Sequence, residues 1–151
     1  MRILSKTLEA GTLLSTVAFI GSILFQIYAR LFLPSAPSWT EEASRLFFVY
    51  AMSFAAGLAV KDNEYVFLDL FYERMKPSVQ KTIDVLVPGI VSLLFLIMGI
   101  FAIQYVQLGI PEKSPSIGIS MAWIFGSVLV MSVTIAIYSI HEIIDKINEI
   151  K

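Results

Sequence analysis

The polar residues best placed to do chemistry in this chain form a short acid–base cluster, Glu41, Glu42 and Arg45. Glu41 precedes Arg45 by four residues, the favourable order for an ion pair on one face of a helix, and Glu42 precedes it by three. Such a pair contributes roughly 0.2–0.5 kcal/mol in water, but a lone arginine at the edge of hydrocarbon is costly. The spacing therefore indicates charge compensation at a helix end, and a polar anchor that docks a partner protein is the functional alternative.

No other constellation predicts a catalytic, metal or cofactor site. The chain has no cysteine and one histidine, His141, for which an interfacial position is a simpler explanation than metal binding. It has no glycine-rich phosphate loop. Proton-coupled transporters usually place an ionisable group in the middle of a span, and none lies there. We expect neither an enzyme nor a protein that transports ions by itself.

Small residues instead form two stripes that suit close helix packing. In the second stripe Ser53 and Gly57 form a small-xxx-small pair, with Ala56 beside them. The stripes either close the chain's own bundle or receive a helix of another membrane protein, and the pattern favours neither. The first stripe, at helical spacing, consists of Gly11, Ser15, Ala18, Ser22 and Gln26.

The composition explains why a membrane must position these residues. Of 151 residues, 57% are hydrophobic and 15% charged, against about 45–50% and 25% in soluble domains, and the mean hydropathy is +0.79. The net charge of −1 gives no field that would attract nucleic acid. Charged residues are also absent from four long runs, residues 10–29, 46–60, 85–111 and 114–140.

These runs predict an all-α integral membrane protein with four transmembrane helices, since about 20 helical residues cross a bilayer. The second uncharged run has 15 residues, about 22 Å, so its helix must extend to Glu42 and Lys61. Ser38 and Glu41 have the spacing of a capping box at its start. The expected spans are about 11–29, 42–61, 83–107 and 119–141, within a single domain, 1–151.

The basic residues predict the orientation through the positive-inside rule. Eight lie on one side of the predicted membrane and three on the other, so both termini of this multi-pass protein are expected in the cytoplasm. Trp39 and Trp123 then lie at the outer interface. The eight are Arg2, Lys6, Lys61, Arg74, Lys76, Lys81, Lys146 and Lys151, and the three are Arg30, Arg45 and Lys113.

The polar stretch between the second and third spans predicts an amphipathic interfacial helix at about 65–76. Polar residues from Asp69 to Asp84 recur at the helical period, while Phe67 and Phe71 lie on other faces. Pro77 is expected to begin the next helix, where its missing N–H costs nothing. A solvated connector with chance periodicity is the alternative.

Two patches of the chain match the pattern of a known family. The first contains Trp39, Thr40, Glu41, Glu42 and Arg45, as in W-x-E-E-x-x-R, then Ala55, Ala56, Gly57, Lys61, Tyr65 and Asp69. The second, from Ser114 to Ala122, is similar to an S-P-x-L-x-I-P-M stretch, with Ser120 in place of a proline. Together they resemble the small (Q-type, DctQ-like) membrane subunit of tripartite ATP-independent periplasmic (TRAP) transporters.

The resemblance implies a complex of three components. A periplasmic protein captures an organic acid, such as a dicarboxylate or a sialic acid, and a large membrane subunit carries it with sodium by an elevator-like motion. The small subunit has no cofactor, packs against the fixed scaffold of the large one within the lipid of the bacterial inner membrane, and helps to dock the binding protein. The candidate anchors are Trp39, Glu41, Glu42, Arg45, Ser53, Gly57, Phe67, Asp69 and Phe71.

Two rivals remain open from the residues. A self-sufficient, homo-oligomeric small exporter would be of similar length, but it is expected to keep a carboxylate inside a span, and residues 11–29 contain none. A membrane enzyme or its assembly factor would need a polar constellation at one membrane face. Co-purification with a much larger multi-span protein would separate these classes.

Overall fold

The described part of the chain is built from long α-helices. The computed structural model describes residues 2–35, 37–62 and 76–150. Within those ranges the helices are α1 (Arg2–Phe32), α2 (Trp39–Lys61), α4 (Pro77–Gly109) and α5 (Ala122–Ile150). All four are long and apolar enough to cross a membrane, which confirms the predicted all-α architecture with four such helices. The predicted interfacial helix at 65–76, with Phe67, Asp69 and Phe71, lies outside the described residues except for Lys76.

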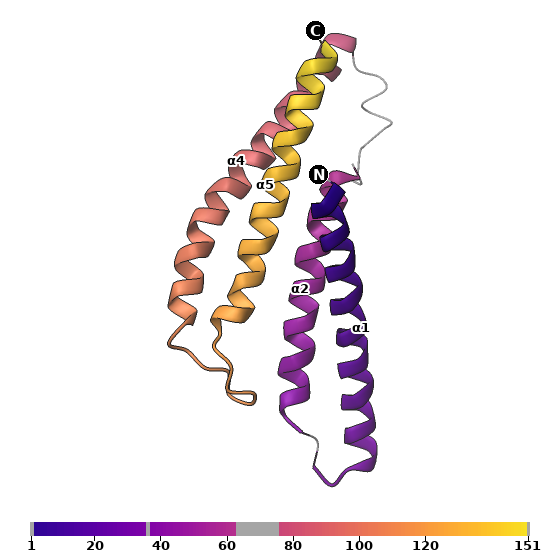
Figure 1. The fold of residues 1–151 in the computed structure, drawn as a ribbon, viewed down its shortest axis with the longest axis vertical. Helices are drawn as coiled ribbons and strands as arrows, with labels where there is room; N and C mark the ends of the chain where they lie inside the picture. The colour runs from indigo at the N-terminus through magenta and orange to yellow at the C-terminus, as the bar shows by residue number, and fades with distance from the viewer. Residues whose placement is uncertain (1, 36, 63–75, 151) are drawn as a thin grey trace.

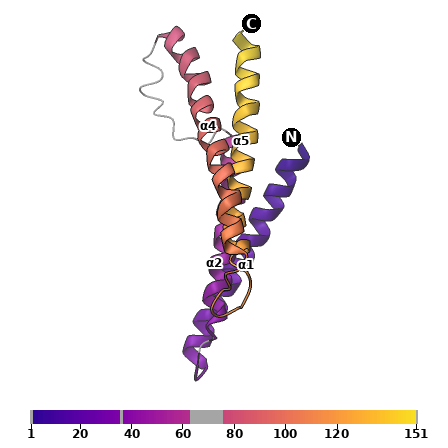
Figure 2. The ribbon, with the colours of Figure 1, turned by 90° about the vertical axis from the view of Figure 1, so that its left-hand side faces the viewer.

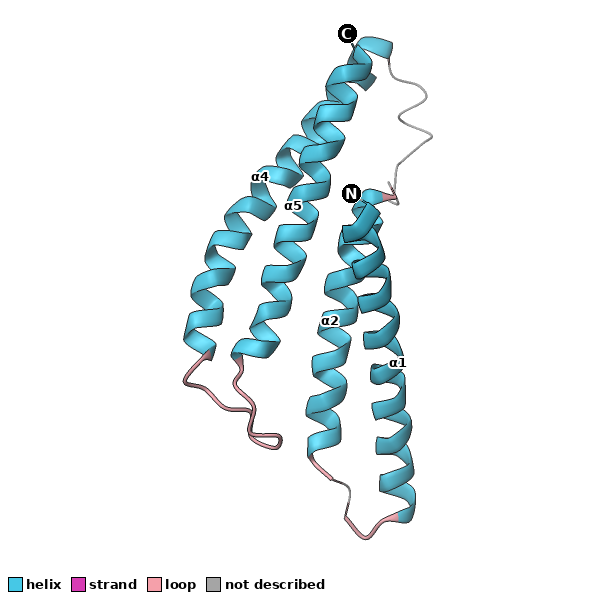
Figure 3. Cartoon of the chain, viewed as in Figure 1, coloured by secondary structure: helices cyan, strands magenta, loops and turns pink. Residues whose placement is uncertain are grey.

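The helices form two antiparallel hairpins, α1–α2 and α4–α5, which meet along α2 and α5. Figure 1 shows the order α4, α5, α2, α1 across one layer, with both turns at the ends away from the termini (Figure 3). Seen from the side (Figure 2), α1 and α4 lean apart towards the ends that carry the termini. The helices therefore form a single layer with two broad faces, and this layer splays at the end that carries the termini.

Helix ends follow local chemistry. Pro77 opens α4 after an extended Lys76, as its sequence position predicts. The capping box predicted for α2 is wrong, because Ser38 has helical dihedral angles and its side chain makes no capping bond. The Thr40 amide and hydroxyl instead donate to the Pro37 carbonyl oxygen, at 3.3 and 2.8 Å. The last helix begins at Ala122 rather than near residue 119, because the hydroxyl of Ser120 accepts the Ala122 N–H at 3.2 Å.

Small residues let the helices approach closely within each hairpin. A Cβ at Gly11 of α1 would lie 2.8 Å from the Phe54 ring of α2, and Ala29 is fully buried further along α1. In the other hairpin a Cβ at Gly109 would lie 2.7 Å from the backbone nitrogen of Ala122. Ser132 of α5 is also fully buried, and its hydroxyl donates to the Val128 carbonyl oxygen of its own helix. Buried hydroxyls satisfied in this way add no unpaired polar group to the contact.

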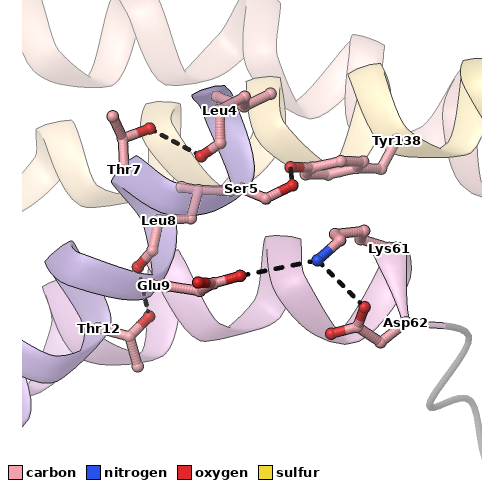
Figure 4. A network of polar contacts seen from close by, with 9 residues as sticks. All are labelled: Leu4, Ser5, Thr7, Leu8, Glu9, Thr12, Lys61, Asp62 and Tyr138. Carbon is pink, nitrogen blue, oxygen red and sulfur yellow. Dashed lines mark hydrogen bonds and ion pairs between the residues drawn. The ribbon is translucent and has the colours of Figure 1, made fainter. Parts of the chain in front are cut away.

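A small apolar core joins the hairpins near the termini. Leu8 of α1, Val60 of α2 and Ile135 and Tyr138 of α5 pack together there. The Ser5 and Tyr138 hydroxyls are hydrogen-bonded at 3.1 Å at its edge (Figure 4). Lys61 lies 3.7 Å from Glu9 and 3.3 Å from Asp62 in the same region (Figure 4). Val91 and Phe95 of α4 also pack against this core, so all four helices contribute to it.

Most of the remaining apolar surface faces outward. Leu14 on α1 is 72% exposed and Leu93 on α4 is 61% exposed, and both belong to long rows of exposed apolar side chains. A soluble protein rarely carries contiguous apolar surface of this extent. The two broad faces are therefore suited to lipid or to another membrane protein.

The α4–α5 hairpin is displaced along the helix axes relative to the other one. Figure 1 shows α4 and α5 continuing beyond the N-terminus of α1. With 33 residues α4 is about 50 Å long, against a hydrocarbon core of about 30 Å. The α4 helix is therefore longer than a membrane crossing needs.

Candidate functional site

The most developed polar site of the described chain is a contact between the start of α2 and the loop that joins α4 to α5. The half-buried Glu42 carboxylate accepts the Ser116 N–H at 3.0 Å and the Ile117 N–H at 2.9 Å. It also accepts the hydroxyl of Ser114, which is buried. We call Glu42, Ser114, Ser116 and Ile117 the loop-side clasp.

The loop is folded so that its amides converge on the carboxylate. The Ser114 N–H donates to the Ile119 carbonyl oxygen at 2.8 Å, and the Gly118 N–H donates to the Ser114 carbonyl oxygen at 3.1 Å. Gly118 has a φ of 76°, a left-handed conformation that glycine adopts without steric cost. Successive N–H groups in such a turn form a concavity that binds anions. Here the anion is a side chain of the same protein.

The clasp was not predicted from the sequence, although it unites the two patches that carry the family resemblance. Helical spacing pairs Glu42 with Arg45, and nothing in that spacing connects Glu42 to the stretch from Ser114 to Ala122. A signal was present, because the Ser-Pro-Ser-x-Gly stretch has turn residues that expose backbone amides. Sequence spacing alone does not say which distant carboxylate would bind them.

Glu41 and Arg45 form the predicted ion pair, with Arg45 Nη2 3.6 Å from Glu41 Oε1. The two side chains are 64% and 62% exposed, so solvent screens the pair and its contribution to stability is small. Glu42 points instead into the clasp. Arg45 is therefore held loosely at the surface, and its predicted role in docking a partner stays a prediction.

The structure places both small-residue stripes at contacts within the chain. All five stripe positions of α1, Gly11 to Gln26, are partly buried, and Gly11 faces Phe54 of α2. On α2 Ser53 is buried, and a Cβ at Gly57 would lie 2.8 Å from Thr134 Oγ1 of α5. Gly11, Ser53 and Gly57 therefore take part in packing within the chain.

The remaining candidates lie at the surface. Trp39 is 47% exposed and stacks on Phe25 with ring centroids 5.8 Å apart. His141 Nδ1 lies 2.8 Å from Asp145 Oδ2, one turn along α5. Within residues 2–35, 37–62 and 76–150, no group of three or more His, Cys, Asp or Glu side chains could hold a metal ion.

Comparisons with known proteins agree on one family. The model of the family "Tripartite ATP-independent periplasmic transporters, DctQ component" matches residues 19–149. A Haemophilus influenzae protein provisionally named as a TRAP transporter small permease is 26% identical over 131 residues, covering 87% of this chain and 79% of that protein. The sialic acid TRAP transporter permease protein SiaT of Haemophilus influenzae is 30% identical over 138 residues, covering 88% of this chain and 22% of SiaT.

The family match therefore spans the whole of α2 and α4 and the segments between the helices, with residues 19–32 of α1 and nearly all of α5. It includes both sides of the loop-side clasp and at least part of each of the four helices that are able to cross a membrane. This chain belongs to the DctQ component family of tripartite ATP-independent periplasmic transporters.

Proposed function

We propose that this chain is the non-catalytic small subunit that anchors the stationary scaffold of a large TRAP membrane subunit. The observation that carries the proposal is the distribution of charge and apolar surface. The membrane-crossing parts of the helices hold no charged residue, and both broad faces of the layer are apolar. Such a layer offers another membrane protein a wide surface to pack against, but it offers an ion or an organic acid little to bind.

The large partner is supported by the comparison with SiaT. The matched region makes up 22% of that protein, so the equivalent of this chain is joined there to a much longer remainder. In the proposed complex the separate large subunit corresponds to that remainder and binds substrate and sodium. An organic acid of the sialic acid or dicarboxylate class is the proposed cargo.

In the proposed orientation both termini lie in the cytoplasm of a bacterium and the loop-side clasp faces the periplasm. The excess of basic residues on the side of the termini supports this orientation. Arg45 and the exposed Lys113 then face the periplasmic binding protein. The interfacial helix predicted at 65–76 would lie on the cytoplasmic side and resist tilting of the layer.

The test is to purify the tagged chain from membranes of its own bacterium. Co-purification of a multi-span protein of much greater mass is expected, and vesicles that contain both proteins should take up an organic acid when the binding protein and a sodium gradient are supplied. If the chain alone assembles into a homo-oligomer that moves a substrate across vesicles, the rival small-exporter function replaces this one.

Docking by Arg45 is tested separately with Arg45→Ala. We expect unchanged assembly with the large subunit but slower uptake at low concentrations of the binding protein, since only the encounter at the membrane surface is weakened. The matched control is Arg30→Ala, which removes another exposed arginine on the same side of the membrane. Uptake by Arg45→Ala equal to that by Arg30→Ala at every concentration would exclude the docking role.

The anchoring role of the interfacial segment is tested with Phe67→Asp and Phe71→Asp. Each places a charge in the predicted apolar face, so it should weaken attachment to the membrane interface and impair uptake without touching the substrate site. Retained assembly together with full uptake in both variants would count against anchoring by this segment.

A further inference from the structure

An exposed amide side chain lies in the membrane-crossing part of α4. Gln104 belongs to the uncharged run 85–111 and to the expected span 83–107, and its side chain is exposed. It forms no hydrogen bond within the described part of the chain. Hydroxyls within the spans, such as those of Ser53 and Ser132, instead donate to carbonyl oxygens of their own helices. The Gln104 carboxamide is therefore a polar group that the chain itself does not satisfy.

The pairing of α4 with α5 keeps one register over much of its length. A Cβ at Gly109 would lie 2.7 Å from the backbone nitrogen of Ala122, and a Cβ at Gly99 would lie 3.6 Å from the Cβ of Ser132. The two contacts are ten residues apart on both helices. A level on α4 can therefore be assigned from the residue that faces it on α5.

This register sets the depth of Gln104 in the membrane. It places Leu108 at the level of Trp123, whose indole ring is expected at the outer interface. Gln104 precedes Leu108 by four residues, so its Cα lies about 6 Å deeper. Gln107 directly precedes Leu108, so it lies at the level of water and lipid head groups.

The direction of α4 keeps the Gln104 amide away from the nearer interface. The Cα–Cβ bonds of a helix tilt towards its N-terminus, and long side chains follow this tilt. The N-terminus of α4 lies at the end of the layer that carries the chain termini (Figure 1). The carboxamide is therefore directed towards the middle of the membrane, and not back towards the level of Trp123.

Hydrocarbon cannot satisfy this amide. Acyl chains have no hydrogen-bond donor or acceptor, and an amide that is transferred to hydrocarbon without a hydrogen bond is strongly disfavoured. Glutamine side chains in transmembrane helices commonly form hydrogen bonds across the contact with a neighbouring helix. The chemistry of Gln104 therefore indicates a polar group of another transmembrane helix as its partner, and excludes lipid alone.

The surface around Gln104 can receive a side chain of such a helix. A hollow of about 320 Å³ lies between Phe101, Gln104 and Leu108 of α4 and Val128 of α5. Phe101 and Leu108 are 61% and 68% exposed, so the apolar rim of the hollow is also open to contact. We call these four residues the amide face.

The opposite edge of the layer differs in this respect. It is formed by α1 (Figure 1), where the amide of Gln26 is on a partly buried side chain. The strongly exposed side chains there, such as Leu14, are apolar, and lipid satisfies them fully. A need for a protein partner is therefore indicated at α4 and not at α1.

We propose that the amide face packs against a transmembrane helix of the large TRAP subunit, with the Gln104 carboxamide hydrogen-bonded to a polar group of that helix. The inference rests on the proposed function and adds which side of the layer the large subunit contacts. The choice of partner is supported by SiaT, in which the region matched by this chain makes up 22% of the protein and is joined to a much larger remainder.

The first test is photo-cross-linking of the complete chain, expressed with its large partner in the membrane. A photoreactive phenylalanine analogue is placed at Phe101 of the amide face or at Leu14 on the opposite edge. Irradiation should join the large subunit to position 101 much more than to position 14. The proposal is overturned if position 101 gives no such product, if it joins a second copy of this chain, or if position 14 reacts equally.

The second test removes the amide. Gln104→Leu should weaken the solubilised complex about 3- to 30-fold, the range for one hydrogen bond between transmembrane helices. Gln107→Leu is the matched control, because it removes an exposed amide from the same helix at the level of the head groups, and it should leave the affinity unchanged. Both isolated variants should melt like the unaltered chain, since neither side chain is buried. Equal affinity of the two variants would contradict the hydrogen bond of Gln104.

The outcomes separate this inference from the proposed function. If the unaltered chain does not co-purify with a large membrane subunit, the proposed function is wrong and the inference is wrong with it. If the complex forms but is indifferent to Gln104→Leu and is not cross-linked through position 101, the function stands and the assignment of the amide face is wrong.

Discussion

Gly57 provides the most direct test of how the two hairpins are joined. A Cβ at this position would lie 2.8 Å from Thr134 Oγ1 and 2.9 Å from Thr134 Cβ, across the contact between α2 and α5. Thr134 cannot easily turn away, because it is β-branched and its hydroxyl donates to the Val130 carbonyl oxygen at 2.8 Å. Gly57→Ala therefore forces the helices themselves to separate by several tenths of an ångström.

The expected magnitude follows from two opposing effects. Overpacking a well-filled contact costs typically about 1–3 kcal/mol. Replacing glycine by alanine inside a helix contributes about 1 kcal/mol in the opposite direction. Gly21→Ala on α1 gains the second effect alone, because a Cβ there meets open space. The difference between the two variants should therefore equal the packing cost, about 1–3 kcal/mol.

The assay is thermal unfolding of the purified subunit in detergent, followed by helical circular dichroism, with Gly21→Ala measured beside Gly57→Ala. Gly57→Ala should melt at a lower temperature than both the unaltered chain and Gly21→Ala. Adding Thr134→Ala removes the closer of the two atoms and should restore part of the loss. Equal melting of the two glycine variants would refute the close contact between α2 and α5 at this level.

Three other changes test the remaining contacts. Glu42→Gln should speed hydrogen exchange of the loop amides that donate hydrogen bonds to the carboxylate, whereas Glu41→Gln should leave their exchange rates unchanged. Equal exchange in both variants would argue against the loop-side clasp. Tyr138→Phe removes the hydrogen bond at the edge of the core, so we expect a loss of about 0.5–1.5 kcal/mol in unfolding free energy. Gly109→Ala should destabilise the α4–α5 hairpin more than Gly99→Ala does. The added Cβ would lie 2.7 Å from the backbone nitrogen of Ala122 at position 109, but 3.6 Å from the Cβ of Ser132 at position 99. Similar melting temperatures of the two variants would contradict this ranking.

The helices could be predicted from the sequence because the bilayer imposes a simple requirement on length and hydropathy. The uncharged runs at residues 10–29 and 85–111 are each at least as long as the roughly 20 residues that a helix needs to cross a membrane. Pro77 marked the start of α4 correctly because a proline at the first helical position has a local cause. These features depend on one segment of chain at a time.

The contacts between segments were harder to predict. Small residues such as Ser53 and Gly57 indicate a close helix contact without naming the helix that makes it. Glu42 had a plausible local partner in Arg45, and only the fold shows that the loop amides compete for its carboxylate. Ser38 failed as a capping residue for a related reason, since its own backbone is already helical and Thr40 bonds to Pro37 instead. In each case the residue type indicates the kind of contact to expect, but the residue that it contacts depends on the fold.

Two of the contacts between the hairpins lie far apart along the helices, and this separation limits how the subunit can deform. One is the apolar core around Leu8 and Tyr138, and the other is the carboxylate of Glu42 on its loop. Sliding one hairpin past the other by a single helical turn, about 5.4 Å, would break both contacts at once. Shear between the hairpins is therefore resisted at two levels of the membrane. Strain applied by a moving neighbour would be passed across the layer as a displacement of all four helices together.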